Sequence, residues 1–344
     1  MLTVLDAIPP GLLDADATEL HRLLAGPTLI HLAGRRQRPL FISVLLHGNE
    51  TTGLVALQGL LNGLQGQELP RSLSLFIGNV QAARYGLRRL DGQTDFNRIW
   101  RGGPDPEHAI ARQVLEQMQA RDVFACIDVH NNTGLNPHYA CVNRLEPGFL
   151  QLARLFSRTV VYFIRPNTVL SMAFAALCPA VTVECGQPGQ PHGTEHVLEF
   201  LNAALHLSEL PDQPPGSTDL DLFHTVATVT IPETVSFGFA NQQHQQRAPQ
   251  TAVDLCLAAG LDHLNFRELP PGTRIATVLQ AEHDRIQAWD EQGREQTSRF
   301  FETHDGELRT TRAVMPSMFT LDERVIRQDC LGYLMERYPV PSAT

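Results

Sequence analysis

The sequence predicts an α/β protein in which a mixed, mostly parallel sheet is covered by helices, with a smaller β-rich domain at the C-terminus. Short apolar runs alternate with amphipathic segments up to about residue 208, which is typical of α/β folds. A stretch rich in Pro and Gly at 210–218 ends this alternation, as a linker would, and short β-branched runs follow it. We therefore expect an α/β domain over 1–209, a linker over 210–218 and a β-rich domain over 219–344.

The expected strands of the first domain are short apolar runs bounded by polar or turn-forming residues. They lie at 29–32, 41–46, 73–77, 123–129, 160–164 and 180–184. The clearest helix is expected over 107–120, because Asp105 suits the N-cap, Pro106 suits the first helical position, and apolar residues recur at helical spacing. Another helix is expected from Thr51 onward. In the C-terminal domain we expect strands at 225–231, 274–278 and 285–289.

Composition narrows the class of protein. The chain of 344 residues carries 37 acidic and 27 basic residues, an acidic balance that argues against a nucleic-acid or anionic-membrane partner. Every basic residue is Arg, which excludes a Schiff-base lysine and a P-loop lysine. The six cysteines form no C-x-x-C pair and are expected to be buried free thiols. With no secretion signal and no long apolar run, a cytoplasmic location is expected. Homo-oligomerisation is left open.

Three residues at strand ends predict a zinc site. His47 and Glu50 follow the run 41–46, and His130 follows the run 123–129. Open α/β sheets bind ligands at the carboxyl ends of their strands, and imidazoles with one carboxylate are a common ligand set for catalytic zinc. An H-x-x-E pair alone recurs by accident, so the alternative is three unrelated polar residues. The matching position of His130 favours the metal site.

The turn between His47 and Glu50 is expected to be tight. Gly48 and Asn49 suit such a turn because both tolerate unusual backbone angles. The third apolar strand, 180–184, ends on Glu184, where a general base for a metal-activated water would be needed. The alternative for this carboxylate is a solvated residue at a strand end.

Two further segments carry chemically active side chains. The segment 84–101 holds five arginines, which would bind an anionic substrate or form a solvated basic loop paired with its own aspartates. We expect the solvated arrangement for Arg88, Arg89 and Arg101, paired with Asp91 and Asp95. The segment 192–196 reads H-x-x-E-H, an inverted zinc-protease pattern. A helix start expected near Thr194 would leave its first histidine outside the helix, so a second zinc site is disfavoured.

The motifs taken together resemble the succinylglutamate desuccinylase and aspartoacylase family of the zinc carboxypeptidase-like superfamily. They occur in the family's order and approximate spacing over about residues 40–205, and the β-rich C-terminal region is compatible with the family's second domain. The motifs are H-G-N-E at 47–50, the segment 79–84, D-F-N-R at 95–98, D-V-H-N-N-T-G at 128–134 and V-E-C-G at 183–186.

The resemblance implies a role for each matching residue. One zinc ion per chain would be held by His47, Glu50 and His130. Glu184 would handle the proton of the attacking water. Asn97 and Arg98 would bind the carboxylate of an amino-acid substrate, and Asn131 would be a further substrate-binding residue.

The chain departs from the family pattern in two places. The family usually shows Asn-Pro near position 79, followed by an arginine that polarises the scissile carbonyl. This chain has Asn79-Val80-Gln81 instead, and its nearest arginine, Arg84, is predicted to take that role. Trp100 stands where Phe is more usual and is expected to reshape a pocket wall.

The predicted function is a zinc-dependent hydrolase that cleaves the amide bond of a small anionic N-acyl amino acid. A metallocarboxypeptidase acting on small peptides would use the same metal set and would differ in pocket depth. A non-catalytic binding module of the same fold is the remaining alternative. The presence of all the metal and base residues argues against it.

Overall fold

The computed structural model describes residues 1–240, 253–280 and 286–341, and these divide into two compact units. The first unit comprises Met1–Asn131, His138–Leu222 and a short C-terminal segment that begins at Pro339. The second comprises Asn132–Pro137 and Phe223–Tyr338. The predicted linker at 210–218 lies within the first unit. Where the functional domains divide stays a prediction.

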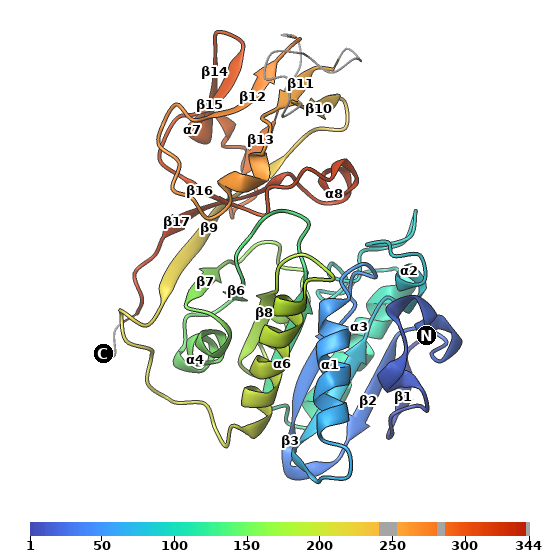
Figure 1. Cartoon of the computed structure of the whole chain (residues 1–344). Helices are drawn as coiled ribbons and strands as arrows, with labels where there is room; N and C mark the ends of the chain where they lie inside the picture. The colour runs from blue at the N-terminus through green and yellow to red at the C-terminus, as the bar shows by residue number, and fades with distance from the viewer. Residues whose placement is uncertain (241–252, 281–285, 342–344) are drawn as a thin grey trace. The chain divides into compact units, whose positions relative to one another are not determined.

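The first unit is built on a mixed sheet whose central strands are parallel, as expected (Figure 1). Its strands run in the order β1 (Thr3–Leu5), β2 (Thr28–Leu32), β4 (Leu69–Ile77), β3 (Gly34–Val44), β5 (Ala125–His130), β8 (Ala180–Glu184), β6 (Tyr139–Val142) and β7 (Thr159–Tyr162). Strand β3 is parallel to β4 and β5, and β5 is parallel to β8. The carboxyl ends of β3, β5 and β8 therefore meet at one edge, where ligands bind in open α/β sheets.

All six predicted strands of the first domain are present, five of them with shifted ends. The prediction for β8 coincides with the observed strand. Strand β3 ends two residues before the predicted end, because Leu45 adopts a left-handed φ of 56°. The strands β1 and β6 were not expected. They are only three and four residues long, too short for a periodicity signal.

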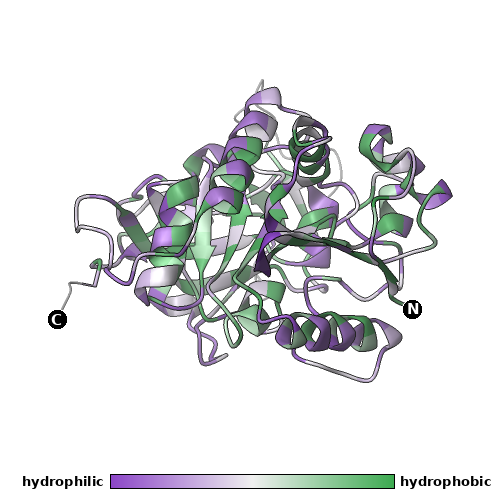
Figure 2. Cartoon of the chain, turned by 90° about the horizontal axis from the view of Figure 1, so that it is seen from below, coloured by the Kyte–Doolittle hydropathy of each residue, from purple (hydrophilic) through white to green (hydrophobic). Residues whose placement is uncertain are grey.

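The helices of the first unit are α1 (Thr52–Gly63), α2 (Val80–Ala83), α3 (Pro106–Ala120), α4 (Pro147–Phe156), α5 (Leu170–Phe174) and α6 (Pro191–His206), with short 3-10 turns at Leu12–Asp14 and Ala17–Arg22. Helix α3 begins at Pro106 with Asp105 at the N-cap position, as predicted. Helix α6 begins at Pro191, so the predicted start near Thr194 is wrong. Figure 2 shows helices that carry both hydrophobic and hydrophilic residues, as expected where helices cover a sheet.

The core of the first unit lies between the sheet and its helices. Phe41 of β3 stacks on Phe174 of α5 at 4.3 Å between ring centroids. Trp100 lies edge-on to Phe76 at 5.9 Å, and its indole N–H donates to the carbonyl of Phe96. Only 4% of Trp100 is exposed, and it packs in the core of the first unit. Its effect on a pocket wall stays a prediction. All six cysteines are buried and free, as predicted.

The second unit is β-rich, as predicted. Strand β9 (Asp221–Thr230) pairs with β13 (Gln287–Trp289) and β17 (Gly332–Arg337), and β17 pairs with β16 (Met315–Ser317). A separate five-stranded sheet contains β10 (Phe237–Phe239), β11 (Leu255–Leu257), β12 (Arg274–Val278), β15 (Glu307–Thr310) and β14 (Phe301–His304). The helical elements are η3 (Leu261–Leu264), α7 (Thr297–Phe300) and α8 (Glu323–Gln328).

The strand predictions for the second unit are confirmed where they can be compared. The predicted strand at 274–278 coincides with β12, and most of 225–231 lies in β9. Of the prediction at 285–289, Arg285 lies outside the described residues and 287–289 form β13. In the described part of the chain, no helix is both long enough and apolar enough to cross a membrane.

Candidate metal centre

The loop between β3 and α1 carries His47 and Glu50. It leaves the sheet at Leu45 and reaches the N-cap of α1 at Thr51. A Cβ at Gly48 would lie 2.2 Å from the backbone nitrogen of Ala83, so only glycine lets the loop pack this closely on α2. The sequence correctly predicts a glycine turn here, but the reason is close approach to a helix and not an unusual backbone angle.

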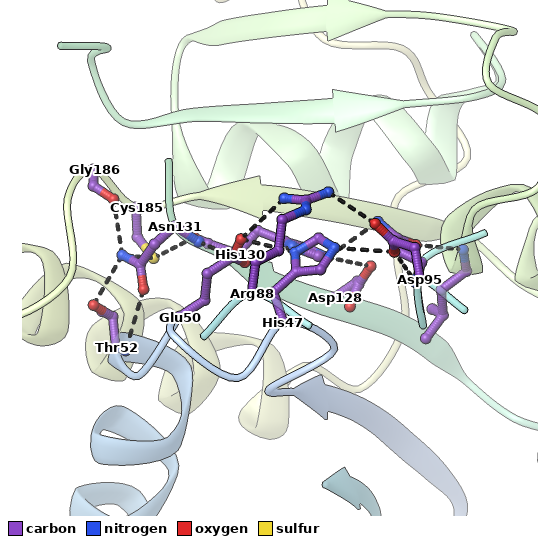
Figure 3. A network of polar contacts seen from close by, with 12 residues as sticks. His47, Glu50, Thr52, Arg88, Asp95, Asp128, His130, Asn131, Cys185 and Gly186 are labelled. Atoms are coloured by element: carbon purple, nitrogen blue, oxygen red, sulfur yellow. Dashed lines mark hydrogen bonds and ion pairs between the residues drawn. The ribbon is translucent and has the colours of Figure 1, made fainter. Parts of the chain in front are cut away.

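Three side chains from two strand ends converge beside this loop (Figure 3). The carboxylate of Glu50 lies between two imidazoles, with Oε1 2.7 Å from Nδ1 of His47 and Oε2 2.7 Å from Nδ1 of His130. One donor atom from each residue lies within 4.8 Å of the other two. All three are buried. The structure therefore brings together the three residues that the sequence assigns to one site.

The other nitrogen of each imidazole faces a second carboxylate. Nε2 of His47 lies 3.2 Å from Asp95 Oδ1, and Nε2 of His130 lies 3.0 Å from Asp128 Oδ2. Histidines that ligate a metal usually pair their outer ring nitrogen in this way, which fixes the tautomer and ring orientation. Two oriented imidazoles and one buried carboxylate fit the donor chemistry of zinc.

The ionisable groups of the centre shift one another's pKa values. Burial would lower the pKa of His47, as would Arg88, but the carboxylates of Glu50 and Asp95 outweigh both and raise it. Burial would likewise lower the pKa of His130, but Asp128 and Glu50 raise it well above its usual value. Burial would raise the pKa of Glu50, but the two imidazoles hold it well below its usual range. The centre is thus rich in carboxylates that attract positive charge.

Arg88 belongs to this centre, which the sequence did not predict. Its Nη2 donates to Asp95 Oδ2 at 3.1 Å, and its Nη1 lies 3.7 Å from Glu50 Oε1. The expected pairing with Asp95 is confirmed. The expected solvation is wrong, because only 12% of the Arg88 side chain is exposed. Burial would raise the pKa of Asp95, but His47 and Arg88 hold it well below its usual value.

The neighbouring arginines of the same loop point elsewhere. Arg84 is exposed, and its guanidinium lies over the ring of Tyr85 at 5.2 Å. Arg89 donates to the backbone carbonyl of Gln93. Sequence spacing alone gave no means of choosing among these arginines, because the path of the loop decides which guanidinium reaches the carboxylates.

Glu184 and Asn131 lie on the strands next to the ligands. Glu184 ends β8 in register with His130, so the two side chains emerge on the same face of adjacent parallel strands. Only 5% of Glu184 is exposed. The backbone N–H of Asn131 donates to Glu50 Oε2, and its side-chain amide donates to Thr52 Oγ1 at 2.9 Å and to the carbonyl of Gly186 at 2.8 Å. Asn131 thus connects the segments that follow β3, β5 and β8.

The D-F-N-R segment supplies two more polar side chains. Nδ2 of Asn97 lies 3.4 Å from Nε2 of His130, and its Oδ1 accepts a hydrogen bond from the backbone of Leu170. Asn97 is buried, whereas Arg98 is half-buried and donates to the carbonyl of Asn97. A polar group therefore lies beside the candidate metal ligands, with a guanidinium attached to the same short segment.

Asp128 could have been found in the sequence, since residues two apart on a strand share a face and Asp128 precedes His130 by two positions on β5. Asp95 was part of a recognised motif, but its contact with His47 joins positions that lie 48 residues apart. No local pattern encodes such a contact.

The chain is similar to known proteins over most of its length. Succinylglutamate desuccinylase from Yersinia enterocolitica is 24% identical over 312 residues, which cover 80% of this chain and 85% of the relative. Among solved structures, succinylglutamate desuccinylase/aspartoacylase from Rhodobacter sphaeroides has a TM-score of 0.57 at 16% identity, covering 90% of this chain and 87% of that one. Murine aminoacylase 3 has a TM-score of 0.50 at 15% identity, covering 89% and 97%.

The structural likenesses, at such low identity, bear on the fold, and they agree with the mixed sheet of the first unit. The family assignment rests on the sequence. The model of the succinylglutamate desuccinylase/aspartoacylase catalytic domain matches residues 36–209, about half of the chain, and this range contains His47, Glu50, His130 and Glu184. The chain therefore belongs to the succinylglutamate desuccinylase/aspartoacylase family of acyl-amino-acid deacylases.

Proposed function

We propose that this protein is a zinc-dependent hydrolase that cleaves the amide bond of a small anionic N-acyl amino acid. The proposal rests on the arrangement of four side chains. The buried His47, Glu50 and His130 converge, and Glu184 stands in register with His130 on the next strand. Metal-assisted hydrolysis needs this combination, because a site for the ion must adjoin a group that moves the water's proton.

In this mechanism the residues of the site have different roles. A zinc ion held by His47, Glu50 and His130 would act as a Lewis acid and lower the pKa of water toward about 7. Glu184 accepts a proton from the water that attacks the acyl carbon, and it returns that proton to the amine as the C–N bond breaks. The products are a carboxylate and a free amine.

We propose that Arg88 stabilises the negative charge that develops on the acyl oxygen. The sequence suggested Arg84, but the contacts of Arg88 with Glu50 and Asp95 support Arg88 in this role. A preorganised donor of this kind typically contributes about 3 to 4 kcal/mol to the transition state. Asp95, which contacts both Arg88 and His47, holds the guanidinium and the imidazole in position.

We propose that the substrate carboxylate binds near Asn97 and Arg98. Asn97 lies beside His130, so a carboxylate bound there would be next to the cleaved amide. Asn131 was also predicted to contact substrate. Its side-chain bonds to Thr52 and Gly186 support a positioning role as well. The names of the relatives, a succinylglutamate desuccinylase and an aminoacylase, agree with an acylated amino acid as substrate. The cytoplasmic location and a homo-oligomeric state stay predictions.

We expect one tightly held zinc ion per chain, lost in His47→Ala or His130→Ala. Each substitution removes one of three protein ligands, whereas the core of the first unit does not depend on the ion. Elemental analysis after gel filtration measures the zinc, and circular dichroism measures the fold. His31→Ala is the matched control, since it removes a buried imidazole that bonds to Ser74. Full zinc occupancy in both site variants would reject the metal centre.

We expect turnover to favour a substrate carboxylate over its carboxamide analogue by about 30-fold in kcat/KM, and Arg98→Gln to abolish this preference. Because Arg98 is half-buried, the lost ion pair should cost about 2 kcal/mol, at the low end for a desolvated pair. The exposed Arg101 of the same loop serves as control, and Arg101→Gln should keep the preference. Equal turnover of the two analogues by the wild-type enzyme would refute the carboxylate site.

A panel of substrates that includes N-acyl amino acids and small peptides distinguishes a deacylase activity from a carboxypeptidase activity. Release of a C-terminal amino acid from peptides, with no deacylation, would favour the carboxypeptidase. Zinc binding without turnover of either class would favour a non-catalytic module.

A further inference from the structure

Three imidazoles outside the metal centre lie in contact in the first unit. His192 and His196 are on α6, and His138 directly precedes β6. The ring of His138 lies 5.3 Å from that of His192 and 5.0 Å from that of His196, measured between centroids. We call these three residues the histidine cluster.

The rings of the histidine cluster lie about as far apart as the two imidazoles of the candidate metal centre. Because α6 begins at Pro191, His192 and His196 stand four apart on one helix, where side chains are neighbours on the same face. Their centroid distances from His138 bracket the 5.1 Å that separates His47 and His130 in the metal centre. Among the described residues, only His47, Glu50 and His130 already hold donor atoms within 4.8 Å of one another, so the rings of the histidine cluster must turn before they share one ion.

The hydrogen bonds of the cluster leave nitrogen lone pairs available. Nε2 of His196 lies 2.6 Å from the carbonyl oxygen of Phe156. It therefore donates its proton there and leaves Nδ1 as the lone-pair nitrogen, an arrangement typical of metal-ligating histidines. Among the described residues, no hydrogen bond engages a ring nitrogen of His138 or His192. The three rings thus retain at least one acceptor nitrogen each when neutral.

The surroundings favour the neutral form of His138. Burial lowers its pKa, and the neighbouring His196 and His192 lower it further. A neutral imidazole is the form that ligates metals. Glycines also make room for this ring, because a Cβ at Gly186 would lie 3.2 Å from Nε2 of His138.

The cluster is not preassembled to the degree of the metal centre. The rings of His138 and His192 are nearly parallel, at 14°, so their nitrogens must turn toward a common point. Rotation about the bond between Cβ and the imidazole is soft, and the exposed His192 is free to turn. Affinity should therefore be lower than at the metal centre, where the donors already converge.

We propose that His138, His192 and His196 form a second metal site, which binds a divalent transition-metal ion of the Zn²⁺, Ni²⁺ and Cu²⁺ class. A ligand set of imidazoles alone selects these ions over Mg²⁺ and Ca²⁺, which prefer oxygen. The second site is independent of the proposed hydrolase activity, because it uses none of the residues assigned to the reaction.

Zinc binding by the full-length protein tests this proposal. In equilibrium dialysis at increasing free zinc, we expect a second equivalent above the tightly held one in the wild type. We expect that second equivalent to be lost in His192→Ala and retained in His47→Ala. His192 is exposed, so its removal should leave the fold intact. The matched control is His206→Ala, which removes another histidine of α6 and should bind as the wild type does.

The outcomes separate the two sites. Retention of the second equivalent in His192→Ala, or its equal loss in His206→Ala, would mean adventitious surface binding and would overturn the proposal. A second measurement uses NMR of protein labelled with ¹⁵N-histidine in the His47→Ala background. Added zinc should shift three imidazole signals, and His192→Ala should abolish the shifts of the two that remain, those of His138 and His196. Unchanged imidazole signals on zinc addition would also overturn the proposal.

Discussion

Glu184→Gln is expected to lower kcat by about 10²- to 10⁴-fold, the usual contribution of a general acid–base group. Glutamine keeps the size and shape of the side chain but does not accept the proton of the attacking water. Since the lost interaction belongs to the transition state, KM should change little wherever KM reflects substrate binding. Steady-state kinetics with an N-acyl amino acid, together with zinc analysis, measures both effects.

The matched control for this substitution is Glu199→Gln, which neutralises an exposed carboxylate on α6 and should leave kcat unchanged. Near-normal turnover in Glu184→Gln would mean that another group moves the proton. Loss of zinc together with activity would make Glu184 a ligand, and the role of Glu50 would then need reassignment.

Arg88→Met is expected to lower kcat/KM by about 10²- to 10³-fold, because it removes a preorganised donor to the developing oxyanion. Methionine retains much of the apolar stem of the side chain. The substitution also leaves Glu50 and Asp95 without their guanidinium partner, so thermal unfolding and zinc content must be measured in the same preparation. Arg88→Lys, which restores a positive charge, should recover part of the activity.

Arg84→Met provides the direct comparison, since both residues are arginines of one loop and Arg84 is exposed. We expect it to behave as the wild type. A large loss of activity in Arg84→Met with near-normal Arg88→Met would restore the original assignment from sequence. A loss in both would indicate that the whole loop responds to either change.

The sequence predicts the elements whose signal is local. Strand β8 is placed correctly because a short run with two valines and a threonine, 180–184, lies between Pro179 and Gly186. The metal-centre residues were identified because they follow such runs, and the sheet places the ends of its parallel strands together. Strand β6, at four residues, carries too little pattern to be recognised. Its pairing with β8 is a tertiary property.

The remaining site residues depend on how loops pack. Arg88 reaches the carboxylates because its segment folds against the turn at Gly48, whose N–H donates to the carbonyl of Arg88. That contact joins two segments distant in sequence, so no window of residues reveals it. The start of α6 was misplaced for a different reason, because a glycine at 193 weakens a helix prediction. Here Gly193 is buried within α6, and a Cβ would lie 2.5 Å from the carbonyl oxygen of Cys185.

The assembly of the metal centre from separate strands has a consequence for when the ion can be taken up during folding. Glu50 and His130 are in contact although they lie 80 positions apart in the sequence. Closing so long a loop costs conformational entropy, and the chain must bear this cost before the two side chains can bind one ion. A fragment holding only the turn after β3 would present one imidazole and one carboxylate, a weak chelator. We therefore expect the proposed zinc ion to be captured after chain collapse, so that its binding would report that the central strands have paired.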